Sequence, residues 1–287
     1  MSGTDAYSLH LPGRRTTSVV FSSPHSGRDY PLPFLAATAL DALAIRSSED
    51  AFVDELFAPA PMHGAALIAA HAPRAYIDLN RASDELDPAL IEGISRSPHN
   101  PRVSSGLGVI PRVVANGRPI YRGKIAITEA ESRIARHWIP YHGALRELLE
   151  TTRAEFGEAV LVDCHSMPRE AIESHTRNGQ PRPQVVLGDR FGAAAGRDMM
   201  DRVEAAFVRT GLRVSRNAPF AGAYITQAYG RPSRNQHAIQ VEIDRSLYMD
   251  EERVERSADF ADFALLMQGV IADLCLIGRE SLPLAAE

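Results

Sequence analysis

Cysteine is scarce in this chain, which has only Cys164 and Cys275 among its 287 residues. Neither belongs to a CxxC pair, so a disulfide framework is excluded. Long uninterrupted apolar runs are also missing: the most apolar late stretch, 260–277, contains Asp262, Gln268 and Asp273, which argues against a membrane span. The stretch 1–17 lacks the apolar core of a signal peptide. We therefore expect a cytoplasmic protein.

Positive charge is not in excess, because 31 Lys and Arg residues face 36 Asp and Glu residues, a net charge of −5. A nucleic-acid partner is therefore disfavoured. The hydrophobic fraction of 45% and the charged fraction of 23% are ordinary and provide a substantial core. Repeats, low-complexity segments and a clear linker are absent. We expect one domain over residues 1–287, and the sequence leaves the oligomeric state open.

Short catalytic signatures are absent as well. The sequence contains no HExxH, P-loop, GxGxxG or GxSxG motif. This absence argues against helical zinc-protease, nucleotide-binding and nucleophile-elbow sites of the usual kinds. A metal site would have to take its ligands from separate parts of the chain.

The stretch Ala159–Pro168, AVLVDCHSMP, is a short apolar strand that ends in polar residues. Strand alternation places Asp163 and His165 on one face and Cys164 on the other. A Cys164–His165 catalytic dyad is therefore geometrically poor, and we expect Cys164 to be a core residue. Strands that deliver polar residues at their carboxyl ends are typical of α/β sites.

Strands and helices alternate along the chain, which predicts a single three-layer α/β/α domain with a mixed central sheet. Pro140 should kink the longest helix. Strands are predicted at 18–21, 65–70, 75–79, 160–164, 185–187 and 237–243, and helices at 36–43, 50–56, 128–156, 190–209 and 251–277.

Two regions lack regular patterns. Residues 1–16 are polar, and we expect them to be flexible. Residues 82–124 are rich in Pro and Gly and form an irregular region that is unusually long for a compact domain. We expect this region to form a partial wall or lid over a site.

Three apolar strands end in residues suited to a site: SVVFSSPHS, AVLVDCHS and HAIQVEIDR. Neighbouring strands of a sheet could bring two histidines and a carboxylate together, a recurring set of ligands for catalytic zinc. The pattern alone is weak, because the chain has ten histidines.

Seven motifs in one order make the chain similar to a known family. The motifs span about residues 20–270 and read PHSG (24–27), EDAFVDELF (49–57), RAYIDLNR (74–81), PIYRGKI (119–125), IPYHGAL (139–145), DCHSMP (163–168) and HAIQVEIDRSLYMDE (237–251). With these motifs the chain resembles the N-formylglutamate amidohydrolases, which are similar in fold to the zinc carboxypeptidases and aspartoacylase.

The resemblance implies a divalent metal, with zinc favoured over others. It implies His25 and His165 as ligands, together with one acid of the pair Glu49-Asp50. Asp50 is favoured and Glu49 is the alternative. Asp163 would orient a ligand histidine from outside the ligand set.

The resemblance also implies a small-molecule substrate, N-formyl-L-glutamate, split into formate and glutamate in histidine degradation. Asn80 and Arg81 resemble a substrate-binding pair, and Glu242 occupies the place of a general base. A guanidinium holds a carboxylate well, and glutamate has two carboxylates, so a second cation is needed. The candidates for it are Arg74, Arg231, Arg245 and His237.

One stretch departs from the family pattern. Relatives tend to have Gly-Gly, and then a basic residue or His before Tyr-Gly, where this chain has Gly222-Ala223 and Gln227-Ala228. The acyl group or side chain of the substrate could therefore differ. The alternatives are a deacylase of another N-acyl amino acid, a carboxypeptidase-like peptidase and a non-catalytic binding protein.

Overall fold

A computed structural model of the protein describes residues 2–4, 6–94, 100–114, 117–173 and 182–280. Its centre is an eight-stranded sheet of order β1-β2-β4-β3-β5-β8-β6-β7, and β9 and β10 form a separate hairpin. The strands are β1 (Ser2–Thr4), β2 (Tyr7–His10), β3 (Val19–Ser23), β4 (Ala66–Ala70), β5 (Ala159–Met167), β6 (Val185–Gly188), β7 (Val214–Arg216), β8 (Gln236–Asp244), β9 (Met249–Asp250) and β10 (Glu255–Arg256).

The sheet is mixed, as predicted. Strands β4, β3, β5 and β8 run parallel to one another, whereas β2 and β6 pair antiparallel with β4 and β8. The four parallel strands all end at one edge of the sheet. Polar residues that follow or end these strands therefore meet there.

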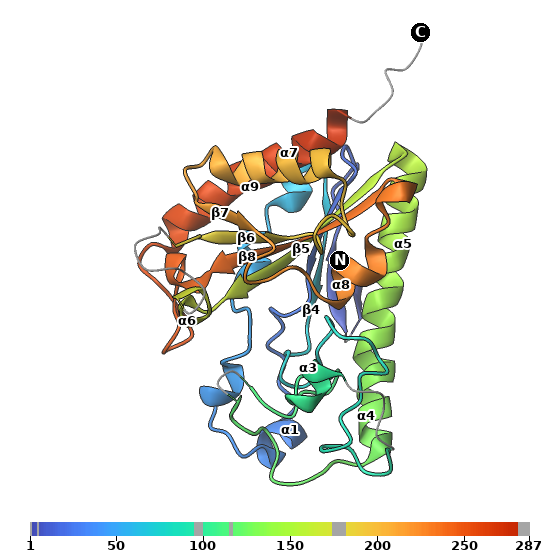
Figure 1. Cartoon of the computed structure of the whole chain (residues 1–287), viewed down its shortest axis with the longest axis vertical. Coiled ribbons are helices and arrows are strands. Elements are labelled where there is room, and N and C mark those ends of the chain that lie inside the picture. The colour runs from blue at the N-terminus through green and yellow to red at the C-terminus, as the bar shows by residue number, and fades with distance from the viewer. Residues whose placement is uncertain (1, 5, 95–99, 115–116, 174–181, 281–287) are drawn as a thin grey trace.

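Helices cover both faces of the sheet (Figure 1). One apolar cluster joins the sheet to α2, α7 and α9, and a second joins its other face to α1, α5 and α8. The predicted three-layer α/β/α arrangement is confirmed. The helices are α1 (Leu32–Ala37), α2 (Val53–Leu56), α3 (Pro101–Ser104), α4 (Ile127–Arg133), α5 (Ile139–Phe156), α6 (Arg169–Glu173), α7 (Arg197–Val208), α8 (Tyr224–Tyr229) and α9 (Phe260–Glu280).

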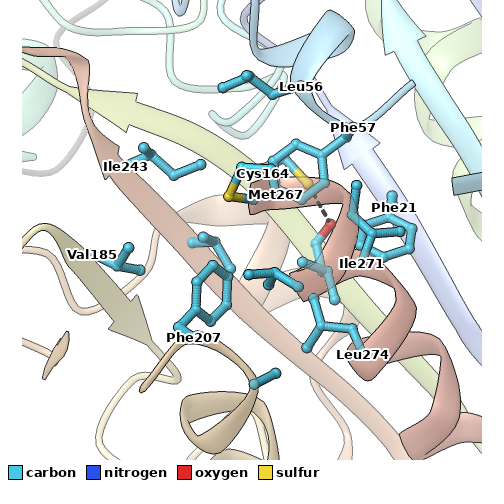
Figure 2. Close-up of a cluster of buried hydrophobic side chains, with 14 of the residues drawn as sticks. Phe21, Leu56, Phe57, Cys164, Val185, Phe207, Ile243, Met267, Ile271 and Leu274 are labelled. Carbon is cyan, nitrogen blue, oxygen red and sulfur yellow. Dashed lines mark hydrogen bonds between the residues drawn. The ribbon is translucent and has the colours of Figure 1, made fainter. Parts of the chain in front are cut away.

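Strand β5 is buried along its whole length and alternates as the sequence predicts. Val160, Val162 and Cys164 belong to the cluster beneath α9, whereas Leu161 packs on the opposite face. Figure 2 shows Cys164 among apolar side chains, and its thiol donates to the carbonyl of Val162. Cys164 is therefore a core residue.

The prediction of a flexible N-terminus is wrong for the described residues of 1–16. Strand β2 pairs antiparallel with β4 and extends the sheet, and β1 pairs with β2. Tyr7 and Leu9 alternate along β2 and pack against the second apolar cluster. This two-residue period is short, and it was hidden in a polar stretch.

The predicted strand at 75–79 is also absent. The amides of Tyr76 and Ile77 both donate to the carbonyl of Pro73, which forms a turn, and the amide of Asp78 donates to Val109. The apolar side chains of this segment are buried beneath the 82–124 region instead. Burial, and not strand pairing, explains the run of apolar residues.

The long helix is interrupted as expected near Pro140. A π-helical segment, Ile134–Trp138, joins α4 to α5, and Pro140 follows in the first turn of α5. Proline has no N–H to donate to the preceding turn, and a π segment is one way to accommodate that loss.

Helix α2 begins three residues later than predicted, and α7 and α9 begin later still. Arg190 and Phe191 have φ angles of 56° and 57°, which a right-handed helix cannot contain, so α7 starts at Arg197. The β9–β10 hairpin occupies the residues before α9, where Val254 has a φ of 52°. Both turns contain apolar side chains, such as Phe191 and Val254, at positions that fit helical spacing. The sequence pattern therefore extends each predicted helix into the turn that precedes it.

Helix α9 is long and apolar enough to cross a membrane by length and composition. Its buried face, which includes Met267, Ile271 and Leu274, packs in the cluster of Figure 2 against Phe21 and Phe207. This packing is that of a core helix.

A matched pair of substitutions in α9 tests this packing. Leu274 is 1% exposed and Leu265 is 69% exposed. We expect Leu274→Ala to lower the free energy of unfolding by about 2–5 kcal/mol, because it leaves a cavity. Leu265→Ala should change it by less than about 0.5 kcal/mol. Denaturant unfolding measures both values, and equal losses would contradict the assigned burial.

Candidate active site

Polar residues from three parallel strands meet at the carboxyl edge of the sheet. His25 follows the end of β3, His165 lies near the end of β5, and Glu242 lies near the end of β8. His165 and Glu242 are register partners across β5 and β8. Since β3 and β8 flank β5, sheet order alone brings these side chains together.

His25, Asp50 and His165 form a buried cluster of potential metal ligands. One atom from each lies within 4.8 Å of the others. Nδ1 of His165 is 3.0 Å and Nδ1 of His25 is 3.5 Å from Oδ2 of Asp50. Nδ1 of His25 is buried without a hydrogen-bond partner. A buried, unpartnered imidazole nitrogen that faces a carboxylate fits a metal ligand, so this group could bind a metal.

The far nitrogen of each histidine is held by a second carboxylate. Nε2 of His25 lies 2.7 Å from Asp78, and Nε2 of His165 lies 2.9 Å from Asp163. A carboxylate behind a ligand histidine fixes its tautomer and ring orientation. Both Nδ1 atoms are thereby left to face Asp50. The family resemblance implies this role for Asp163, whereas the role of Asp78 is seen only in the structure.

The other oxygen of Asp50 is also fixed. Oδ1 accepts hydrogen bonds from Ser166 (3.2 Å) and from Nη2 of Arg245 (3.0 Å). Arg245 donates its Nε to Ser166 and its Nη1 to the carbonyl of Ser47. All three guanidinium nitrogens are therefore engaged. Arg245 orients Asp50, and this position does not support the predicted role in holding a substrate carboxylate.

Arg245 reaches the site because β8 ends one residue before it. A 3₁₀ turn begins at Arg245, so the strict alternation that would point its side chain away from Glu242 no longer applies.

Glu49 faces a different environment from Asp50. Its carboxylate pairs with Arg46 at 2.9 Å and accepts a hydrogen bond from Tyr30. Phe52 then adopts a φ of 65°, so the backbone turns sharply into α2. The structure places Asp50, and not Glu49, beside the histidines.

Opposite charges set the protonation of the cluster. Burial raises the pKa of Asp50, but the neighbouring imidazoles of His165 and His25 outweigh this effect and hold that pKa well below its usual range. Burial likewise raises the pKa of Asp78, and Arg74 and His25 bring it well below that range. Both carboxylates are thus ionised at neutral pH, as a metal site requires. Burial raises the pKa of Glu242 to about 8.

A cavity of about 500 Å³ lies over the cluster. Its wall includes described residues of the irregular 82–124 region, among them Arg102, Leu107 and Val114, so this region forms part of a wall as predicted. Movement of the region as a lid stays a prediction. The predicted site residues that line the cavity are His25, Arg74, Asn80, Arg81, His165, Glu242 and Arg245.

His237 does not line this cavity. It lies near the start of β8, whereas Glu242 lies near the end, and strand residues advance by about 3.3 Å each. Its Nδ1 accepts a hydrogen bond from the amide of Gly196. The expectation that His237 binds substrate is therefore wrong in position.

The Asn80–Arg81 segment is held from several sides. The carboxamide nitrogen of Asn80 lies 3.2 Å from Nε2 of His165, and its oxygen accepts from the amide of Ile225. The indole of Trp138 donates to the carbonyl of Arg81, and His142 contacts the carbonyl of Leu79. The long helix therefore fixes this segment from behind.

The departure noted at 222–228 touches the cavity in part. Gly222 and Ala223 belong to its lining, whereas Gln227 and Ala228 do not. Gly222 has a φ of 108°, a backbone conformation that residues with a side chain rarely adopt. A Cβ atom at this position would also collide with the side chain of Thr226.

Comparison with known proteins places this site in a family. The family model described as N-formylglutamate amidohydrolase matches residues 17–249. The chain belongs to this family. The resemblance found in the sequence motifs is confirmed.

Two relatives of this N-formylglutamate amidohydrolase family member align with most of its length. An N-formylglutamate deformylase of Pseudomonas aeruginosa is 32% identical over 91% of this chain and 92% of its own. One of Pseudomonas putida is 30% identical over 81% of this chain and 82% of its own.

Solved structures agree with this assignment. The crystal structure of N-formylglutamate amidohydrolase from Ralstonia eutropha JMP134 has a TM-score of 0.90 and 34% identity, covering 97% of this chain and 100% of its own. A protein from Agrobacterium tumefaciens, at 17% identity and a TM-score of 0.64 over 96% of both chains, shares the fold.

Two further site residues were missed from the sequence. Asp78 supports His25, and Gln240 donates to Oε1 of Glu242 at 2.7 Å. Gln240 shares a strand face with Glu242, and that alternation was the available signal. Asp78 lies in a turn, so no periodic pattern could have assigned its direction.

Two neighbouring acids provide a test of the metal cluster. We expect Asp50→Asn to weaken binding of a divalent metal by more than about tenfold, because even residues behind the ligands contribute that much. Glu49→Gln should retain the metal, since Glu49 bonds Arg46 and Tyr30. Metal content per chain after equilibrium dialysis measures both. Loss of metal in Glu49→Gln alone would reject the assignment of Asp50.

Proposed function

We propose that this family member is a cytoplasmic zinc enzyme that hydrolyses N-formyl-L-glutamate to formate and L-glutamate in histidine degradation. The observation that carries the proposal is the buried His25–Asp50–His165 cluster beside Glu242 in a cavity with arginines. Relatives named N-formylglutamate deformylase support the choice of substrate.

His25, Asp50 and His165 would hold the metal. Two imidazoles and one carboxylate form a recurring set for catalytic zinc, with one position left open. When bound, zinc supplies Lewis acidity, which polarises an amide carbonyl and makes water more acidic.

Glu242 is the proposed general base. It is buried, lines the cavity and is oriented by Gln240 through its Oε1. Its raised pKa makes the ionised carboxylate a stronger acceptor for a proton from water. Glu242 would then deliver that proton to the amide nitrogen, so that glutamate leaves with a neutral amine.

Asn80, Arg74 and Arg81 are the proposed substrate-binding residues. Arg74 gives its Nε to Asp78, and no hydrogen bond of its terminal nitrogens is found within the described part of the chain. Arg81 gives Nε and Nη1 to the carbonyls of Leu107 and Asn80. Among the described residues its Nη2 has no hydrogen-bond partner and can donate to a carboxylate, which a guanidinium binds through charge-assisted hydrogen bonds.

A second candidate keeps this chemistry and changes the acyl group or the amino acid of the substrate. Ala223 belongs to the cavity lining and carries a methyl group where the family resemblance implies a second glycine, so the space beside the substrate would differ. A deacylase of another N-acyl amino acid would use the same cluster. The rates at which the protein hydrolyses different N-acyl amino acids distinguish the two candidates.

The wild-type protein should hold about one zinc per chain and release formate from N-formyl-L-glutamate. A chelator should abolish this activity and added zinc should restore it, because the ligand set otherwise lacks its Lewis acid. N-acetyl-L-glutamate and N-formyl-L-aspartate serve as comparison substrates. Faster hydrolysis of either would favour the second candidate, and full activity without metal would refute the zinc mechanism.

Removal of the proposed base should affect turnover more than binding. We expect Glu242→Gln to lower kcat by about 10²–10⁴-fold, the usual contribution of a general base. Its metal content should stay that of the wild type. Glu252→Gln, which changes an exposed carboxylate outside the cavity, is the control. A Glu242→Gln enzyme with wild-type kcat would exclude this role.

A further inference from the structure

The cavity contains an arginine that none of the sequence motifs includes. Arg102 lies in helix α3, within the irregular region, and it lines the cavity together with Arg81. No ion pair or side-chain hydrogen bond of Arg102 occurs among the residues that the structure describes. Its guanidinium is therefore available to a ligand.

Arg102 and Arg81 are close enough to influence each other. Burial lowers the pKa of Arg81; Asp78 opposes this shift, and the positive charges of Arg74 and Arg102 add to it. Arg81 is also tied to the irregular region through its bond to Leu107. Like charges that line one cavity repel each other unless an anion lies between them.

Arg245 and Arg231 are less suited to a second carboxylate than Arg102 is. All three guanidinium nitrogens of Arg245 donate hydrogen bonds, to Asp50, Ser166 and the carbonyl of Ser47. Arg231 donates to the carbonyls of Gln227 and Gly230 and lies outside the lining of the cavity.

We propose that Arg102 binds the side-chain carboxylate of the substrate and so determines specificity for N-formylglutamate over neutral N-formyl amino acids. This inference rests on the proposed function. The α-carboxylate is joined to the carbon that bears the scissile amide, so it must stay near the metal cluster. Arg81 follows Asn80, which contacts His165, and is buried. Arg102 is exposed, so it lies further out, where a carboxylate two methylenes away can reach.

The chemistry of the lining supports this division. Leu107, Val113 and Val114 provide apolar surface from the same region as Arg102. A short aliphatic chain that ends in a carboxylate matches apolar surface beside a guanidinium. The cavity thus suits an acidic side chain better than a short neutral one.

The test compares N-formyl-L-glutamate with N-formyl-L-glutamine, which has the same shape without the charge. In Arg102→Ala, kcat/KM for N-formyl-L-glutamate should fall about 10- to 100-fold, mainly through KM, because a charge-assisted hydrogen bond is lost. The value for N-formyl-L-glutamine should stay unchanged. Arg102→Lys, which retains the charge, should recover part of the loss.

Arg122→Ala is the matched control, because Arg122 is an exposed arginine of the same region outside the cavity lining. It should behave as the wild type for both substrates. An unchanged glutamate-to-glutamine ratio in Arg102→Ala would overturn the role of Arg102, as would an equal loss for both substrates. A wild-type protein that hydrolyses neither substrate would instead refute the proposed function.

Discussion

The carboxylate of Asp50 is the contact on which the geometry of the site depends. One oxygen faces Nδ1 of His25 and His165, and the other accepts from Ser166 and Arg245. Its backbone amide also donates to the carbonyl of His25. The end of β5 and the segments that follow β3 and β8 are thereby tied to one buried group. A buried charge is tolerated only with such partners, so loss of one partner would disturb the others.

Much of this arrangement follows from strand patterns. Alternation predicts Asp163 and His165 on one face of β5, and the structure agrees. The same alternation puts Gln240 and Glu242 on one face of β8. Parallel strands then bring their carboxyl ends to one edge. The motifs identified the family, because residues that touch one cavity are constrained in type and order even when they lie far apart in sequence.

The parts that could not be predicted lie where periodicity ends. His237 lies near the start of β8, and Arg245 directly follows its end. The sequence does not show where the strand ends, so it does not show which of the two side chains reaches the site. Asp78 sits in a turn, and its direction is set by Pro73 and Val109. Arg102 lies in an irregular region where side-chain direction depends on tertiary packing. Sequence spacing carries little information about such positions.

The π-helical segment 134–138 has a consequence for the phase of the long helix. Successive residues of an α-helix are separated by about 100° around its axis, so a local change in winding rotates everything that follows. Arg133 of α4 reaches the carbonyl of Tyr76, while His142 of α5 reaches that of Leu79. The residues on either side of the π segment thus face the same turn-rich segment. The change of winding in the π segment sets the phase of α5 relative to α4, and so both side chains reach the backbone of the segment that carries Asn80.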